Sequence, residues 1–233
     1  MIFELDAGLI FELDARPSDS PFVELIWHAR SGRPGMFHSI ASNHWMMVVT
    51  LRDGKSTLTV RGPETRATPL FSDGEGEWVG IWFRVGAFMP HLPVSALVDR
   101  DLTLPGAGKR SFHLDGTAWE FPDYENADTF VDRLVRKGLL VRDPVVDEVL
   151  HGRRNDLSAR SVQRRFVHAT GLTQSAVRQI ERARTAMTLL QRGVSILDTV
   201  HEAGYYDQSH LTRSLKRWLG HTPAQIVRMT APE

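Results

Sequence analysis

Polar and cationic side chains recur at helical spacing near the end of the sequence. In segment 207–219, Ser209 and Arg213 share one side of a helix that turns by 100° per residue, and Leu211 lies on the opposite side. Such a free face suits a helix in the major groove of DNA, because Arg pairs bidentately with guanine, Gln pairs with adenine and Lys contacts phosphates. The candidate contacts on this helix are Gln208, Ser209, Thr212, Arg213, Lys216 and Arg217.

A turn and a short preceding helix must position that face. Ile196, Val200 and Ala203 place apolar groups on one side of a helix, Gly204 permits a sharp turn, and Asp207 can cap the next helix. The spacing predicts a helix-turn-helix unit.

A second candidate unit lies upstream, in LSARSVQRRFVHATG. Ser158 can cap this helix, Phe166 and Ala169 lie on its apolar side, and Gly171 ends it. Its partner helix would be PVVDEVLH, although the connection GRRND lacks the Ala and Gly of the downstream unit. The candidate contacts on the outward side are Arg160, Gln163 and Arg164.

One uninterrupted helix is expected between the two units, from Thr173 to Arg192. Its twenty residues would span about 30 Å at 1.5 Å per residue. One turn of duplex DNA is about 34 Å, so the helix could hold the two readers in successive major grooves.

From about Asp143 to Arg228 the chain resembles the DNA-binding domain of the AraC/XylS family of bacterial transcription regulators. The motifs that carry the resemblance are QRRF with the following TG, ERAR, LL and AGYYDQSHLTRSLKRWLGHTP. The resemblance implies base contacts by the matching positions on both predicted reading helices. It also implies that a cupin-like N-terminal β domain with an effector pocket precedes them.

The front part of the chain reads as β structure. Short apolar runs such as FVELIWH, HWMMVVTL and WVGIWFRV are bounded by turn-forming residues, and Asp53-Gly54 predicts a tight hairpin turn. The predicted fold is therefore α+β: a β barrel or jelly roll, then an all-α double helix-turn-helix region. We expect a front domain over 1–120, a connecting helical segment over 121–142 and the DNA-binding domain over 143–233.

The connecting segment has two open interpretations. Phe130, Val131 and Leu134 stand at helical spacing, and this helix could connect the domains or contact a second copy of the chain. The aromatic and acidic residues from Trp119 to Asp128 could face the basic readers or cover the mouth of the barrel.

The charge is also distributed unevenly between the predicted β-rich and helical parts of the chain. Residues 151–233 hold 13 Lys and Arg against 6 Asp and Glu, a net charge of +7, which leaves −7 for the rest of a chain that is neutral overall. A basic region favours a polyanionic partner.

Several classes of function are excluded or disfavoured. The chain has no cysteine. None of the common catalytic motifs is found, so we expect no enzyme and no cofactor. Isolated histidines without a spaced ligand pattern predict no metal. No apolar run is long enough to cross a membrane, and no signal peptide is evident, so the expected location is the cytoplasm.

Together these observations predict a sequence-specific regulator of transcription that binds double-stranded DNA. A small effector, bound in a pocket lined by some of the five front-domain tryptophans, is a further expected partner, and its site residues are unknown. RNA polymerase and a second copy of the chain are the other partners considered. The alternatives are a constitutive or architectural DNA-binding protein without a ligand, and a cupin-like enzyme fused to a DNA-binding domain.

Overall fold

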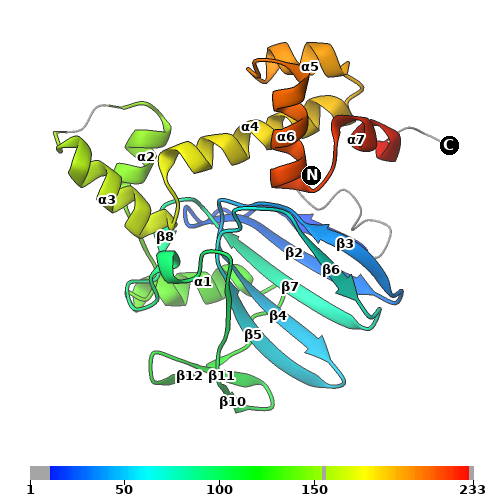
Figure 1. Ribbon diagram of the computed structural model, residues 1–233. Helices are drawn as coiled ribbons and strands as arrows, with labels where there is room; N and C mark the ends of the chain where they lie inside the picture. Colours follow the sequence, from blue (N-terminus) through cyan, green and yellow to red (C-terminus); the bar gives the residue numbers. More distant parts are fainter. Residues whose placement is uncertain (1–10, 154–155, 231–233) are drawn as a thin grey trace.

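The computed structural model describes residues 11–153 and 156–230 (Figure 1). A β-rich part comes first and an all-helical part follows, which confirms the predicted α+β order. Residues 1–10 of the expected front domain, residues 154 and 155 of the connection GRRND and residues 231–233 lie outside the described residues.

The largest sheet has six antiparallel strands in the order β1-β2-β7-β4-β5-β9. The three apolar runs predicted as strands form β2, β7 and β4, which are neighbours inside this sheet, because inner strands bury the most side chains. The strands are β1 (Phe11–Arg16), β2 (Val23–Ser31), β4 (Met46–Arg52), β5 (Lys55–Arg61), β7 (Gly76–Phe83) and β9 (Asp101–Thr103).

The hairpin between β4 and β5 forms as predicted. Asp53 and Gly54 both have positive φ angles, 50° and 68°, and Arg52 pairs with Lys55. These angles belong to the tight turn whose twist matches that of the flanking strands.

The large sheet does not close, so the β-rich part is not a closed barrel, one of the two forms that the sequence predicted. β1 and β9 form its two edges: β1 pairs only with β2 and β9 only with β5 in the described part of the chain, and they do not pair with each other. Closure requires two neighbours for every strand. Here β9 has three residues, and β3 (Gly35–Ser39) and β6 (Thr68–Ser72) pair only with each other as a separate ribbon.

A first hydrophobic core lies between this sheet and a cover formed by a helix and a small sheet. Phe130, Val131 and Leu134 from the cover helix are buried in it, as are Trp45 and Trp119. The helix expected in segment 121–142 therefore packs on the β-rich part. The cover consists of α1 (Ala127–Arg136), β10 (Gly106–Gly108), β11 (Ser111–Leu114) and β12 (Thr117–Glu120).

The aromatic and acidic patch belongs to the same cover. Asp128 accepts a hydrogen bond from Arg16 of β1 at 2.7 Å, and the Arg16 guanidinium lies 5.2 Å from the ring centroid of Tyr124. These contacts point toward the sheet rather than toward the basic readers, which favours the covering role over the interface.

The helical part has a core of its own, into which Ile40 and Ala41 of the β-rich part also extend. A short pairing of β13 (Val141–Arg142) with β8 (Ala87–Phe88) ties its start to the β-rich part. The helices are α2 (Pro144–Leu150), α3 (Ala159–Thr170), α4 (Gln174–Gln191), α5 (Ile196–Glu202), α6 (Gln208–Leu219) and α7 (Pro223–Thr230).

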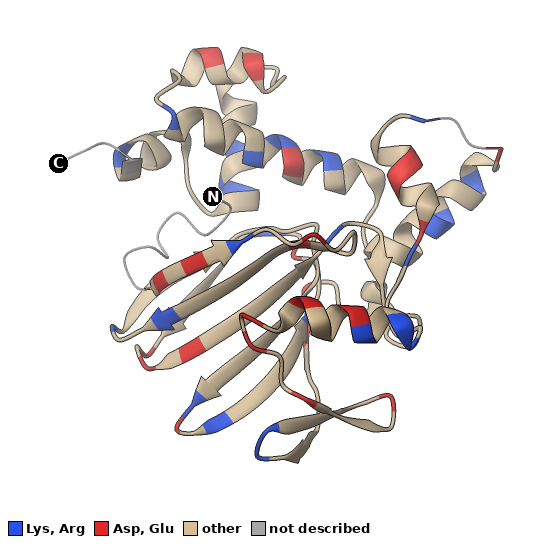
Figure 2. Ribbon diagram, turned by 180° about the vertical axis from the view of Figure 1, so that it is seen from behind, with Lys and Arg blue, Asp and Glu red and all other residues tan. Residues whose placement is uncertain are grey.

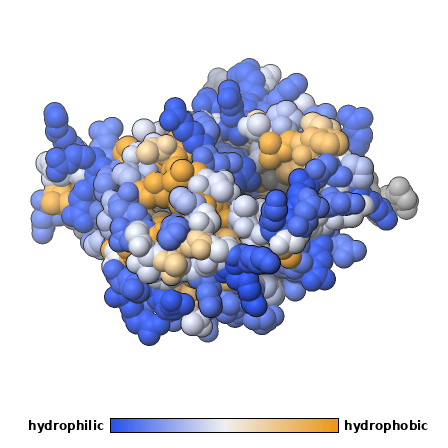
Figure 3. All heavy atoms as spheres, turned by 90° about the horizontal axis from the view of Figure 1, so that it is seen from below, coloured by the Kyte–Doolittle hydropathy of each residue, from blue (hydrophilic) through white to orange (hydrophobic). Residues whose placement is uncertain are grey.

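Hydrophilic side chains cover most of the surface seen from below, and apolar residues show there in separate patches (Figure 3). Within the described residues, no helix has both the length and the apolar character needed to cross a membrane.

Candidate nucleic-acid interface

The downstream helix-turn-helix unit has the predicted geometry. α5 and α6 are joined by a turn in which Gly204 has a φ angle of 68°. The Asp207 side chain caps α6 and accepts a hydrogen bond from the backbone N–H of His210 at 2.6 Å. Both predictions concern local backbone conformation, and both are confirmed.

The two faces of α6 separate as the spacing predicts. Leu211, Leu215, Trp218 and Leu219 are buried in the helical core. Thr212 is half-buried, and its hydroxyl donates to the carbonyl of Gln208 at 2.8 Å, which leaves its oxygen and methyl group for contacts. The remaining candidate contacts are exposed: Gln208, Ser209, Arg213, Lys216 and Arg217.

A network that the sequence analysis missed holds α6 against α4. The Tyr205 hydroxyl and the Ser214 hydroxyl lie 2.9 Å apart, and both residues are buried. The guanidinium of Arg182 lies 4.6 Å from the Tyr205 ring centroid and donates to the carbonyl of Gly204 at 3.4 Å. Single-sequence patterns contain no signal for this network, because it joins three separate elements.

The upstream unit places its three candidate contacts on one exposed face. Arg160, Gln163 and Arg164 are exposed on α3, and Phe166 and Ala169 on the other side are fully buried. Helix α3 starts at the predicted Ser158 cap, which accepts from the backbone N–H of Ser161 at 3.2 Å. Its end is the predicted Gly171, with a φ angle of 74°. Cationic residues lie along α3 and α4 (Figure 2).

Asp143 fixes the angle between α2 and α3. Its carboxylate accepts from the backbone N–H of Val145 at 3.0 Å and so caps α2. The same carboxylate receives two hydrogen bonds from Arg165 on α3, at 2.9 and 2.7 Å. This bidentate pair fixes geometry as well as charge, and it commits Arg165 to structure rather than to DNA.

Helix α4 joins the two units without interruption. It runs over 18 residues, so its length is about 27 Å. The Thr173 side chain caps its start, as predicted, and its apolar stripe is buried. The predicted stripe residues are Val177, Ile180, Ala183, Met187 and Leu190.

The middle of α4 lies against the β-rich part, where the half-buried side chains of Arg184 and His44 both lie against the ring of Trp82. The guanidinium of Arg184 lies 5.6 Å from the Trp82 ring centroid, and its Nε and Nη2 atoms are inaccessible to solvent and have no hydrogen-bond partner among the described residues. Burial lowers the pKa of Arg184 to about 10. Arg184 itself is therefore part of the contact between the helical part and the β-rich part.

His44 stacks on the other side chain of this contact, Trp82, with ring centroids 5.7 Å apart. Burial, and then the charge of Arg184, lower the pKa of His44 to about 4, although a hydrogen bond of its Nδ1 with the carbonyl of Phe83 raises it. His44 is therefore neutral in the folded chain at pH 6, where it titrates in the unfolded chain.

Acidification should destabilise the folded chain through His44. Between pH 6.5 and pH 4, the His44 side chain takes up a proton in the unfolded chain but not in the folded chain. The free energy of unfolding is therefore highest above pH 6.5 and decreases as the pH falls toward 4. We expect a loss of about 2 kcal/mol, less than the full shift implies, because the side chain is partly hydrated. Thermal unfolding at pH 7 and pH 4.5 measures it.

The variant His44→Gln isolates this effect from other groups. Its amide can still donate to the Phe83 carbonyl but does not titrate. Burial raises the pKa values of Glu64 and Glu181, which oppose the trend in both proteins. If parent and variant lose the same stability on acidification, His44 does not carry the effect.

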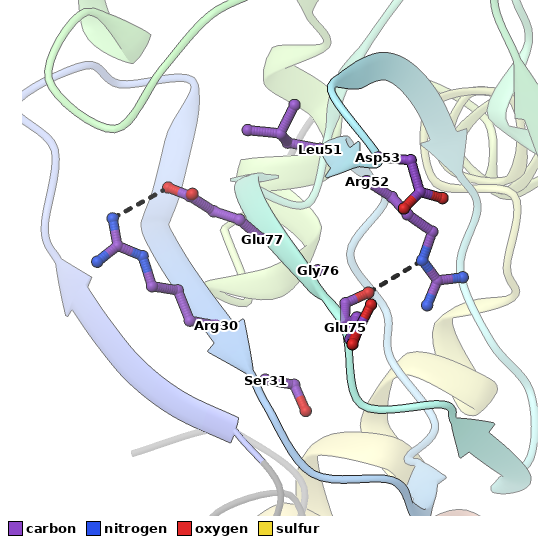
Figure 4. A pocket seen from close by; sticks show the side chains of 8 residues that line it. All are labelled: Arg30, Ser31, Leu51, Arg52, Asp53, Glu75, Gly76 and Glu77. Carbon is purple, nitrogen blue, oxygen red and sulfur yellow. Dashed lines mark hydrogen bonds and ion pairs between the residues drawn. The ribbon is translucent and has the colours of Figure 1, made fainter.

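A polar pocket of about 300 Å³ lies at one end of the large sheet (Figure 4). Its cations are paired: Arg30 contacts Glu77 at 3.3 Å, and Arg52 pairs with Asp73 and donates to the carbonyl of Glu75 at 2.9 Å. In the described part of the chain, no three His, Cys, Asp or Glu side chains gather as metal ligands would.

Two helix-turn-helix units on one connecting helix define a DNA-binding region. Residues 152–229 match the family model of a helix-turn-helix domain. The C-terminal part of the chain is therefore of the AraC type, as the resemblance predicted, and the chain is a DNA-binding transcription regulator. None of the curated proteins compared with the sequence matches it.

Among solved structures, the chain is similar to ToxT from Vibrio cholerae. One ToxT structure has 10% sequence identity, with 96% of this chain and all of ToxT covered, at a TM-score of 0.39. ToxT bound to (E)-4-(8-methylnaphthalen-1-yl)but-3-enoic acid also has 10% identity, with 95% and 100% covered and a TM-score of 0.39.

Proposed function

We propose that α3 and α6 read two successive major-groove segments of one DNA site, with α4 holding them apart. The observation that carries this proposal is the placement of two capped helices, each with an exposed polar and cationic face, at the two ends of one 18-residue helix. The proposed contacts are Arg160, Gln163 and Arg164 on α3, and Gln208, Ser209, Thr212, Arg213, Lys216 and Arg217 on α6.

The contacts on α6 should divide into base-reading and phosphate-binding ones. The first turns of a reading helix usually meet the base edges. Arg213 lies in that half of α6 and is exposed. Arg217 lies one turn later, and its guanidinium lies 4.5 Å from the ring centroid of Trp218, near the β-rich part. We assign base contact to Arg213 and phosphate contact to Arg217.

Replacing Arg213 by Ala should cost about 1 to 3 kcal/mol of binding free energy on the preferred site and relax the sequence preference there. Replacing Arg217 by Ala should weaken specific and random duplexes alike, and should lower the slope of log affinity against log salt by about 1. Titration of both variants on both duplexes over a salt series measures these effects. Equal losses on the two duplexes for Arg213→Ala would contradict the assignment.

We further propose that residues 1–120 sense an effector or form a dimer, that 121–142 connect, and that 143–233 bind DNA in the cytoplasm. Aromatic side chains on the large sheet support an effector site. The Trp27 ring lies over Gly80 so closely that a Cβ there would come within 2.0 Å of it, and Trp78 lies over Gly76. Both tryptophans are half-buried, unlike the core tryptophans Trp45 and Trp119.

A footprint on the promoter region of its own gene, with and without cell extract, tests this role. A footprint that changes with extract, and with a heat-stable small-molecule fraction of it, supports an effector. A footprint that is identical in all conditions favours the constitutive DNA-binding alternative. Contact with RNA polymerase and the absence of enzymatic activity complete the proposal for a regulator of this type.

A further inference from the structure

The C-terminal end of α6 is capped by the β-rich part. The last carbonyls of a helix have no partner within the helix. Here the backbone N–H of Ala67 donates to the carbonyl of Arg217 at 2.9 Å, and the N–H of Ala41 donates to the carbonyl of Trp218 at 2.7 Å. Two separate loops of the β-rich part therefore complete the hydrogen bonding of one reading helix.

Close packing surrounds these hydrogen bonds. A Cβ placed on Gly220 would lie 2.8 Å from the His38 ring and 3.3 Å from the Cβ of Ala67. The rings of His38 and His221 are 4.7 Å apart, and Ile40 is buried in the core of the helical part. The end of α6 is thus fixed in position and not merely touched.

The C-terminal end of the other reading helix rests on the same part of the molecule. A Cβ on Gly171, which ends α3, would lie 2.8 Å from Val98 and 3.1 Å from the carbonyl of Val94, in and after the short helix η2 (Val94–Ala96). The rings of Phe88 and His168 are 5.2 Å apart.

The connecting helix is held between them. Asn43 donates to the carboxylate of Glu181 at 3.2 Å, and Arg184 lies over Trp82. Helices α3, α4 and α6 therefore all contact the β-rich part, and α3 and α6 contact it with their C-terminal ends.

The two docking surfaces are joined to each other inside the β-rich part. Gly62 N–H donates to the carbonyl of Arg100 at 3.1 Å, and Asp99 N–H donates to the carbonyl of Pro63 at 2.9 Å. A Cβ on Gly62 would lie 1.8 Å from the carbonyl oxygen of Leu97. The segment that docks α6 and the segment that docks α3 therefore touch without space for a side chain.

The opposite ends of both reading helices stay open. The first turns of α3 and α6 lie away from the large sheet (Figure 1), and their candidate contacts Arg160, Gln208 and Ser209 are exposed. The docked arrangement therefore leaves these reading faces accessible.

We propose that the β-rich part is a second brace for the two readers, which fixes the ends of α3 and α6 at the separation used on DNA. The connecting helix α4 is the first brace. This inference rests on the proposed function, since it concerns how the two readers are placed for one DNA site. It predicts that the docked arrangement persists when DNA binds.

A reversible cross-link tests whether docking and DNA binding are compatible. The chain has no cysteine, so the double variant Ala67→Cys with Gly220→Cys contains only the designed pair of thiols. The Cβ separation of 3.3 Å is close to the 3.5 to 4.5 Å or so of natural disulfides. The strain of a side chain at Gly220 affects both redox forms, so the oxidised form is compared with the reduced form of the same variant.

We expect the oxidised variant to bind the specific duplex within about threefold of the reduced form, with the same footprint over two groove segments. A loss of about tenfold or more on oxidation, reversed by reductant, would show that DNA binding requires undocking and would overturn the brace. Failure of the folded variant to cross-link would also overturn it, because α6 would then not dock at Ala67.

A loosening variant gives an independent measurement that does not depend on the disulfide. His38→Ala removes packing from the end of α6, and Met36→Ala, exposed on the same strand, is the matched control. The brace predicts about tenfold weaker specific binding for His38→Ala and unchanged binding to random duplex. Unchanged or stronger specific binding would contradict it. If the parent chain itself binds no specific duplex, the proposed function fails instead.

Discussion

An alanine inserted between Thr185 and Ala186 should abolish sequence-specific DNA binding. The insertion rotates everything beyond it by about 100° and lengthens α4 by about 1.5 Å. Specific affinity should then fall to the level of non-specific binding, a loss of roughly a thousandfold or more. Non-specific, salt-sensitive binding should survive in part, because it depends on charge.

The rotation of about 100° disturbs the structure more than the lengthening of about 1.5 Å. It removes Ala186, Met187 and Leu190 from the helical core, in which all three are buried. The rotated α4 would also carry α6 away from the β-rich part, to which the end of α6 is hydrogen-bonded. The insertion variant therefore cannot keep both the packing of α6 on α4 and the hydrogen bonds of α6 to the β-rich part.

The matched control is Thr185→Ala, which changes the same exposed position without an insertion. Footprints of both variants, with circular dichroism to establish that they are folded, measure the effect. A folded insertion variant with an unchanged footprint over two groove segments would show that the readers are flexibly joined.

Replacing Gly62 by Ala should lower the free energy of unfolding by about 3 kcal/mol or more. The added Cβ would lie 1.8 Å from the carbonyl oxygen and 2.3 Å from the carbonyl carbon of Leu97, so a backbone segment has to shift. A flexible side chain could move aside at low cost, but a backbone carbonyl followed by the hydrogen-bonded turn at Asp99 and Arg100 cannot.

Gly32→Ala is the control for this substitution, because no atom lies within 4 Å of a Cβ there. Its effect should stay within about 0.5 kcal/mol. Denaturant unfolding of the parent and both variants compares them directly. Equal stabilities for the two variants would show that the segments around Gly62 and Leu97 do not meet in solution.

Local chemistry let the sequence determine most of the secondary structure and the helix-turn-helix units. The Asp53-Gly54 turn, the Gly204 turn and the Asp207 cap each depend on residues adjacent in the chain, and each formed as predicted. The buried and exposed faces of α6 follow from helical period alone. The AraC-type motif spans consecutive residues, so its class was also accessible.

Only the tertiary structure decided what depends on contacts between distant segments. No local pattern shows that the sheet stays open between β1 and β9, that Arg165 pairs with Asp143, or that Arg184 lies over Trp82. Helical period alone predicts that a cation on the outward face of a helix is exposed to solvent, because it contains no information on which other element covers that face. Likewise, the free carbonyls at the end of α6 found their donors in Ala41 and Ala67, more than a hundred residues away in the sequence, because burial forces every such group to find a partner wherever the fold brings one.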